Sequence, residues 1–104
     1  MKPKFRQKLH ALSATVILCA ASLSAVAQTP PPGRLLASNC FQCHGTNGKG
    51  PGFDTLAGKS ASEIYKEMIE FRSGKEGNGL MAKHSMGYTD AQLRLLAQWL
   101  STQR

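Results

Sequence analysis

The chain has 104 residues and a formal net charge of +7, so it is long enough for one small domain, and its charge taken alone would suggest a nucleic-acid or membrane-surface protein. Four of its 13 basic residues lie within the first eight positions, ahead of an apolar stretch at residues 11–26. The remaining nine basic and six acidic residues nearly balance, and no aromatic and basic interleaving of the single-strand-binding kind occurs. We therefore exclude nucleic acid as a partner.

The basic N-terminus, the apolar stretch and the small residues Ala25 and Ala27 are together typical of a secretory signal peptide cleaved after Ala27. The apolar stretch is shorter than the roughly 20 residues that span a bilayer, so we expect residues 1–27 to be removed rather than kept as a membrane anchor. The mature chain, residues 28–104, would then lie in a bacterial periplasm without a membrane span. Cys19 would leave with the signal.

The first part of the mature chain is predicted to contain a tether, a short helix and a loop. Residues 28–33 include three consecutive prolines, which favour an extended and exposed segment. Residues 34–43 contain no helix breaker and carry apolar residues at helical spacing, so we expect a helix that ends near Gly45. The glycine-rich stretch at residues 45–58 is interpreted as an irregular loop. We expect one domain at residues 34–104.

A capping box predicts the start of a central helix. Ser60 and Glu63 have the spacing in which the hydroxyl and the carboxylate each accept a hydrogen bond from the other residue's backbone N–H. Ile64, Met68 and Phe71 follow on one helical face, and a Ser-Gly pair shortly afterwards ends the helix.

A second capping box, formed by Thr89 and Gln92, predicts a last helix with an apolar stripe from Leu93 to Leu100. Between the last two helices, residues 73–88 are interpreted as a second long loop. The predicted fold class is therefore all-α, with three main helices joined by two long loops. Loops of about 15 residues are uncommon in so small a domain and usually carry function.

Cys40, Cys43 and His44 form the C-x-x-C-H signature of covalent haem attachment. Cysteines three positions apart on a helix project to the same side, so both thiols can form thioethers with the two vinyl groups along one porphyrin edge. The adjacent histidine can then give an imidazole nitrogen to the iron. One covalently bound haem c would also supply apolar core that a domain of this size lacks.

Three other interpretations of the same residues are weaker. A thioredoxin-like dithiol would require a βαβ pattern around the cysteines, and none is visible. A zinc site would require a second pair of ligands at suitable spacing, which the sequence does not have. A structural disulfide beside a chance histidine would leave the small core without support. The export signal and the adjacent His44 favour haem.

The sixth iron ligand is open at this point. The downstream donors of suitable chemistry are Met68, Met81, His84 and Met86. Met68 lies on the apolar face of the central helix, which indicates core packing. The other three lie in the second loop, from which the backbone can approach the iron. A methionine thioether would raise the reduction potential, whereas a second histidine would lower it.

Across residues 33–103 the sequence resembles the class I c-type cytochromes, above all the cytochrome c553 and c4 group and the cytochrome subunit of flavocytochrome c sulfide dehydrogenase. The resemblance rests on five segments, which are Cys40 to Gly48, Leu56 to Lys59, Phe71 to Lys75, Leu80 to Lys83, and Gly87 to Asp90. It implies the small class I cytochrome c fold, with the first and last helices packed crosswise around one covalent haem.

The resemblance also implies site residues. In this group the axial methionine precedes the Ser/Thr cap of the last helix by eight residues, which is the distance from Met81 to Thr89. Met81 and His44 are therefore the expected iron ligands, with Cys40 and Cys43 as the thioether residues. The group usually has a proline whose carbonyl accepts the second N–H of the proximal histidine. Asp54 stands at that place here, and its carbonyl is the available acceptor.

An iron with both axial positions filled is expected to transfer electrons and not to be catalytic by itself. The resemblance implies redox protein partners and leaves two roles open. The chain would be the haem subunit that takes electrons from a flavoprotein that oxidises sulfide, or a free carrier to an oxidase or reductase. A haem protein with an open sixth site is a third alternative.

Overall fold

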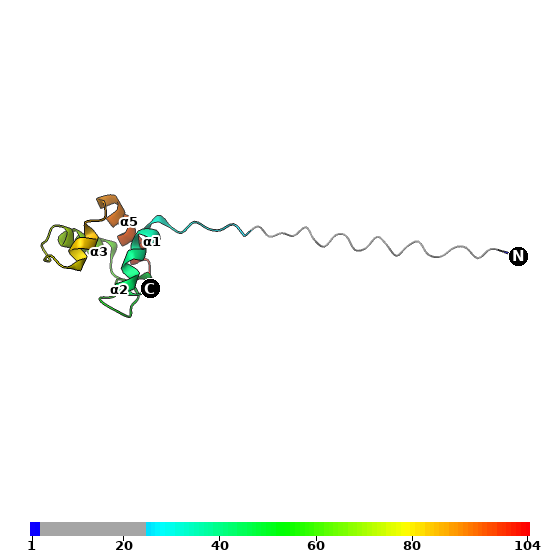
Figure 1. The fold of residues 1–104 in the computed structure, drawn as a ribbon, viewed down its shortest axis with the longest axis horizontal. Coiled ribbons are helices and arrows are strands. Elements are labelled where there is room, and N and C mark those ends of the chain that lie inside the picture. Colours follow the sequence, from blue (N-terminus) through cyan, green and yellow to red (C-terminus); the bar gives the residue numbers. More distant parts are fainter. Residues whose placement is uncertain (3–24) are drawn as a thin grey trace.

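The computed structural model describes residues 1–2 and 25–104, and within them the regular elements are all helical. In chain order these elements are α1 (Pro32–Ala37), η1 (Ser38–Cys40), α2 (Phe41–His44), η2 (Thr46–Gly48), α3 (Ala61–Arg72), α4 (Leu80–Ser85) and α5 (Asp90–Ser101) (Figure 1). The all-α prediction is confirmed. Most of the predicted signal peptide falls outside the described residues. Within the described part, no helix is long and apolar enough to cross a bilayer.

The first helix differs from its prediction in both its start and its continuity. It begins at Pro32, two residues early, because proline suits the first turn of a helix, where its missing N–H has no partner to lose. Pro32 and Gly33 are helical, and Gly33 is buried, so the last two residues of 28–33 do not form the predicted extended tether. A 3₁₀ turn then separates α1 from α2, and the Ser38 hydroxyl donates to the Leu35 carbonyl at 2.6 Å. Such short-range bonds compete with a regular helix.

The two predicted caps are formed to different extents. At α5 the Thr89 hydroxyl accepts from Gln92 N at 3.2 Å and the Gln92 amide oxygen accepts from Thr89 N at 2.9 Å, so the capping box is complete. At α3 the Ser60 hydroxyl accepts from Glu63 N at 3.1 Å. The reciprocal bond predicted for Glu63 is not formed, because its carboxylate lies 4.0 Å from Lys59 Nζ instead.

The second predicted loop contains an unpredicted helix, α4. Ala82 and Ser85 are its buried residues, and the Ser85 hydroxyl donates to the Ala82 carbonyl at 2.9 Å. Small residues of this kind produce no apolar stripe, and six residues are too few for a helical period to be recognised. Met81 therefore lies on a helix rather than on irregular backbone.

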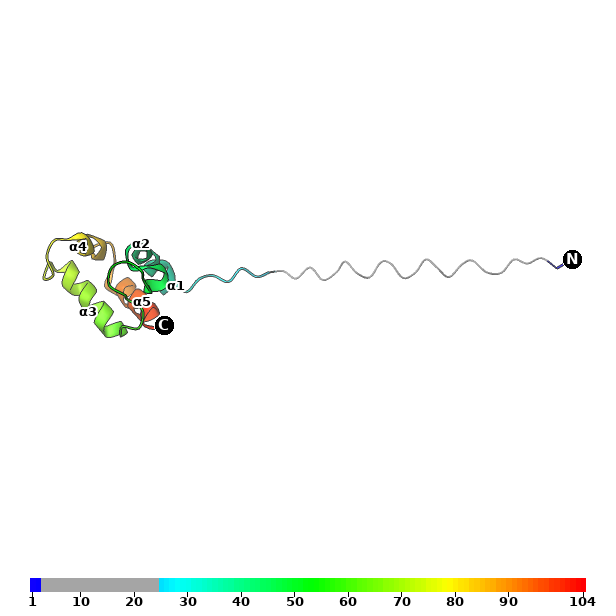
Figure 2. The same ribbon diagram turned by 90° about the horizontal axis from the view of Figure 1, so that it is seen from below.

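Helix α5 occupies the centre of the domain, since it contacts both α1 and α3, while α4 packs against α3 (Figure 2). The crossing of the first and last helices is thus as expected. Within residues 25–104 the main core cluster consists of seven buried residues, which are Ala37, Ile64, Met68, Leu93, Leu96, Ala97 and Leu100. This core is small, and half-buried side chains such as Trp99 and Tyr88 extend it. A domain with so few buried side chains gains much from an apolar cofactor.

Candidate functional site

A cavity of about 460 Å³ lies between η1, α2, α3, α4 and α5. It falls within the range of roughly 300–1,000 Å³ that is typical of cofactor sites. Core residues form much of its wall, including Ile64, Met68, Leu96 and Leu100. The cavity therefore adjoins the core directly, and a flat apolar ligand in it would complete the hydrophobic interior.

Cys40, Cys43 and His44, three of the predicted site residues, all line this cavity. Cys40 ends η1, and Cys43 and His44 end α2, so the C-x-x-C-H residues lie on consecutive helical turns, as predicted. The two cysteines are not joined to each other in a disulfide. Burial, and to a lesser extent the neighbouring Cys43, raises the pKa of the Cys40 thiol. Reactive redox cysteines have lowered thiol pKa values, so this environment does not support a thiol redox centre.

The imidazole of His44 is held by the backbone of the first loop. Its Nδ1 lies 2.5 Å from the carbonyl oxygen of Asp54, and His44 as a whole is 8% exposed. Because a carbonyl oxygen can only accept a hydrogen bond, Nδ1 carries the proton and donates. The other ring nitrogen, Nε2, is then the one with a lone pair for a metal. The acceptor that the sequence offered at Asp54 is used.

The loop reaches His44 by folding tightly beneath α2. Gly45 ends the helix with φ +80°, and a Cβ there would lie 2.2 Å from the Gly50 carbonyl oxygen. Gly52, at φ +142°, approaches so closely that a Cβ would lie 2.2 Å from the Cys43 carbonyl oxygen. Phe53 N then donates to that same carbonyl at 2.8 Å. These glycines are required for the return of the chain that brings Asp54 to the histidine.

The three methionines that follow the haem motif differ in burial and in their position relative to the cavity. Met81 is half-buried and lines the cavity from α4, whereas Met86 is 58% exposed and is not part of its wall. Met68 is buried in the core, as expected, and also forms part of the cavity wall. His84 lines the cavity three residues after Met81 on the same helix. Two of the three open candidates for the sixth ligand thus remain within the site.

Tyr88 is a residue of the site that the sequence did not reveal. Its ring lines the cavity, and its hydroxyl donates to the Leu36 carbonyl at 2.9 Å and accepts from Asn39 Nδ2 at 3.0 Å. These bonds tie the start of α5 to α1 and η1, and burial raises the pKa of the phenol. A single tyrosine in a loop gives no periodic signal, so only the fold identifies its role.

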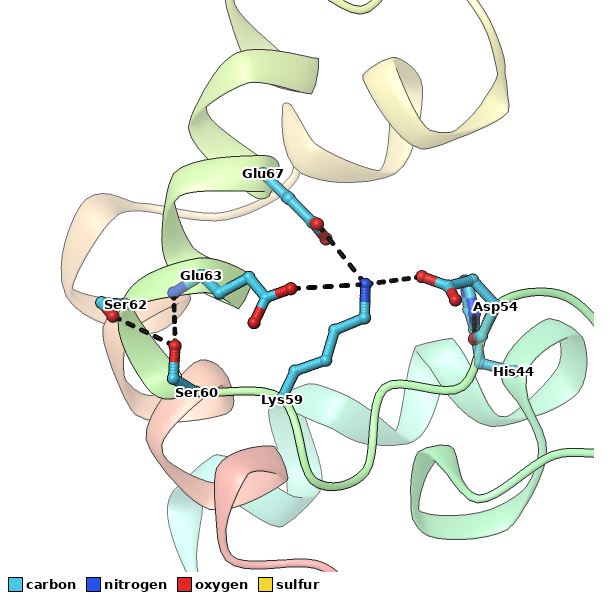
Figure 3. Close-up of polar contacts among 7 residues, drawn as sticks. All are labelled: His44, Asp54, Lys59, Ser60, Ser62, Glu63 and Glu67. Atoms are coloured by element: carbon cyan, nitrogen blue, oxygen red, sulfur yellow. Dashed lines mark hydrogen bonds and ion pairs between the residues drawn. The ribbon is translucent and has the colours of Figure 1, made fainter.

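Lys59 lies at the centre of three carboxylates beside the His44 bond (Figure 3). Its Nζ is 2.7 Å from Asp54 Oδ2, 3.4 Å from Glu67 Oε1 and 4.0 Å from Glu63 Oε1. The hydrogen bond from Lys59 lowers the pKa of the Asp54 carboxyl, and the same bond raises the pKa of the Lys59 ammonium. The side chain of Lys59 is only 21% exposed. The cluster connects the loop that carries Asp54 to helix α3.

An all-helical domain that encloses such a cavity beside a C-x-x-C-H turn has the architecture of a class I c-type cytochrome. The family model described as cytochrome c oxidase, cbb3-type, subunit III matches residues 27–100, and the chain belongs to this family of cytochromes. Membership implies one covalently bound haem c with its iron. The apolar cavity, the paired thiols and the histidine with a free Nε2 lone pair fit that group.

Several known cytochromes are similar to the chain. It is 32% identical over 72 residues to the cytochrome subunit of sulfide dehydrogenase of Chlorobaculum tepidum, across 68% of this chain and 66% of that protein. It is 36% identical over 69 residues to the thiosulfate dehydrogenase electron acceptor of Thiomonas intermedia, across 62% of this chain and 32% of that protein. The chain thus spans less than two thirds of the length of either relative.

Among solved structures, the cytochrome c4 of Acidithiobacillus ferrooxidans superposes with a TM-score of 0.64 at 27% identity. The superposition covers 76% of this chain and 53% of that one. The class I cytochrome fold expected from the sequence is therefore confirmed, and the chain is a c-type cytochrome domain with one haem-attachment motif among residues 25–104.

Proposed function

We propose that this chain is an exported cytochrome that carries single electrons at a haem whose iron is held by His44 and Met81. The observation that carries the proposal is that both side chains line one apolar cavity, His44 from α2 and Met81 from α4. When bound, the haem supplies an iron that changes reversibly between the ferrous and ferric states. With His44 and Met81 both as ligands, the iron would have no coordination position left for a substrate, so the chain would transfer electrons without chemistry at the metal.

The rim of the cavity supports docking of a redox partner. Phe53 and Leu80 line the cavity and yet are 73% and 64% exposed. Apolar side chains at the mouth of a cofactor site provide a contact surface through which an electron can pass to a protein pressed against it. The partner therefore meets the domain at the edge formed by the first loop and α4.

Lysines in the chain segments that border the cavity would give the proposed docking surface its charge. Lys49 and Lys83 are exposed and form no ion pair among the described residues. Lys59 and Lys75, in contrast, are engaged with carboxylates at 2.7 Å each. Of the four lysines of the two loops, only the first two therefore present an uncompensated positive charge, which favours a partner with an acidic surface.

The proposed electron donor is a flavoprotein that oxidises sulfide, with this chain as its haem subunit. The similarity to a cytochrome subunit of sulfide dehydrogenase supports it. A second role, as a separate carrier, is supported by the similarity to a thiosulfate dehydrogenase electron acceptor. The two roles differ in a measurable way, because a subunit stays bound to its donor whereas a carrier dissociates after each transfer.

The proposal includes export, with cleavage after Ala27. The test is to produce the whole chain in a bacterial host that matures c-type cytochromes, and to determine the N-terminus of the periplasmic product. We expect a coloured protein that begins at Gln28, binds little carbon monoxide when reduced, and shows a methionine-to-iron charge-transfer band when oxidised. Rapid binding of carbon monoxide would instead indicate the open sixth site.

Partner choice is tested with the flavoprotein subunit of a sulfide dehydrogenase. Sulfide should reduce the cytochrome only when the flavoprotein is present, and co-elution in size-exclusion chromatography would identify a bound subunit. The variant Lys83→Gln should slow the second-order reduction at low salt, since it removes a free charge. Its matched control, Lys75→Gln, removes a lysine that Glu70 already compensates. Equal slowing by both variants would contradict the proposed docking edge.

A further inference from the structure

The Asp54 carbonyl that holds His44 belongs to a short stretch of backbone between two anchors. On one side, Phe53 N donates to the Cys43 carbonyl at 2.8 Å, and on the other, Leu56 N donates to the Gly48 carbonyl at 2.9 Å. The peptide plane that follows Asp54 lies between these anchors. Rotation of this plane would turn the carbonyl oxygen away from Nδ1 without breaking either anchor. The orientation of this plane is set by ψ of Asp54 and φ of Thr55, and no proline ring fixes φ at residue 55.

The side chain of Asp54 supplies the missing restraint. Its carboxylate is bound by Lys59 at 2.7 Å, and the same ammonium is 3.4 Å from Glu67 on α3 (Figure 3). Glu67 also lines the cavity. The contacts of Lys59 with Asp54 and Glu67, called the clamp below, therefore connect the cavity wall to the loop that carries Asp54. Because Lys59 is largely buried while Asp54 is 66% exposed, it is the lysine that fixes the position of the pair.

We propose that Lys59 is a positioning residue which, by clamping the Asp54 side chain to α3, holds the Asp54 carbonyl on Nδ1 of His44 and so sets the orientation and basicity of the imidazole. The inference rests on the proposed role of His44 as the iron ligand. A hydrogen bond to the second nitrogen raises the basicity of a metal-bound imidazole. A more basic ligand favours ferric iron, so a loosened clamp raises the reduction potential.

Exposed ion pairs contribute little to the stability of a fold. The role proposed for the Lys59–Asp54 pair does not depend on such a contribution. Its effect is local, since it selects one orientation of one peptide group. The competing explanation is that Lys59 acts on the haem only as a nearby positive charge. Under that explanation, Lys59 would change the potential through space and would leave the hydrogen bond of His44 unchanged.

The deciding measurement is the exchange of the His44 Nδ1 proton with solvent, followed by NMR on the reduced haem protein. In Lys59→Met we expect exchange to accelerate about tenfold, which corresponds to about 1.4 kcal/mol. Asp54→Ala should give the same acceleration, and the double variant should add nothing, because each single change opens the same clamp. Lys59→Arg should retain slow exchange. Unchanged exchange in both single variants would overturn the proposal.

The reduction potential provides a second, independent readout. The double variant Lys59→Met/Asp54→Ala leaves the net charge unaltered, so a purely electrostatic role predicts almost no shift, whereas the clamp predicts a raised potential. The matched control is Lys75→Met/Glu70→Gln, which removes another pair at 2.7 Å without touching the loop and should leave both readouts unchanged. If His44 does not bind the iron, the spectrum of the wild-type protein already shows it. The proposal that His44 is a ligand and the proposal that Lys59 positions it can therefore be rejected independently.

Discussion

Gly33 of α1 lies against Trp99 of α5 with no room for even a methyl group between them. A Cβ on Gly33 would be 2.7 Å from the Cβ of Trp99 and 2.4 Å from the Leu95 carbonyl oxygen. Neither neighbour is the flexible end of a long side chain. The crossing of the first and last helices, on which the buried face of α5 depends, is therefore set by the absence of a side chain at this position.

Replacement of Gly33 by alanine should destabilise the domain. The added methyl group forces α1 and α5 apart, and overpacking of this kind costs about 1–3 kcal/mol. Denaturant unfolding of the haem protein measures the loss. Arg34→Ala, an exposed change on the same helix, serves as the control and should stay within about 0.5 kcal/mol. A Gly33→Ala protein as stable as the control would contradict the observed packing.

Loss of the Tyr88 hydroxyl should also lower stability. In Tyr88→Phe, the Leu36 carbonyl loses its donor at 2.9 Å and Asn39 loses its acceptor, so we expect a cost of about 1 kcal/mol. Tyr65→Phe is the matched control, since its hydroxyl accepts an exposed bond from Arg94 at 3.1 Å and is also hydrogen-bonded to the exposed carboxylate of Asp90. Thermal unfolding should separate the two variants, and an equal shift in both would show that Tyr88 does not tie α5 to α1.

Much of this site follows from short-range sequence rules. The C-x-x-C-H motif, the cap at Thr89 and the apolar stripe of α5 are local patterns with a fixed physical meaning, and the structure shows the helices that they predict. The cofactor follows from the same motif, because its donor chemistry suits one group. Such features can be predicted from the sequence because each depends on residues within one or two helical turns of one another.

Other features depend on contacts that sequence spacing does not report. Helix α4 is stabilised by the burial of Ala82 and Ser85 against α3, so its residues show no apolar period of their own. The role of Tyr88 depends on its distance from α1, 52 residues away in the chain. Long-range packing decides each case.

The Arg72–Asp90 pair joins the end of α3 to the start of α5 and should make stability depend on pH. The hydrogen bond from Arg72 lowers the pKa of Asp90, so the folded state favours the carboxylate. The stabilisation is therefore complete above the ordinary aspartate pKa of about 3.9 and is lost as the pH falls through the lower folded value. Asp90→Asn should lower the midpoint of thermal unfolding at pH 7, and the difference from wild type should vanish in strong acid.

The control for this pH dependence is Glu76→Gln. Glu76 is exposed and forms no ion pair among the described residues, so the variant loses the same charge without losing a partner. Its unfolding midpoint should follow that of the wild type at every pH. If Asp90→Asn and Glu76→Gln behave alike, the effect of Asp90 is one of net charge rather than of its bond to Arg72.

The positions of the methionines lead to a spectroscopic prediction about the iron. In Met81→Ala the cavity loses its thioether, so the ferric protein should lose the methionine charge-transfer band and the ferrous protein should bind carbon monoxide readily. Met86→Ala is the matched control, because its side chain is 58% exposed and lies outside the cavity wall, and its spectrum should equal that of the wild type. If Met81→Ala stays low-spin, addition of His84→Ala tests whether the imidazole one turn later has replaced the thioether. A low-spin double variant, or a loss of ligation in Met86→Ala alone, would show that Met81 is not the ligand.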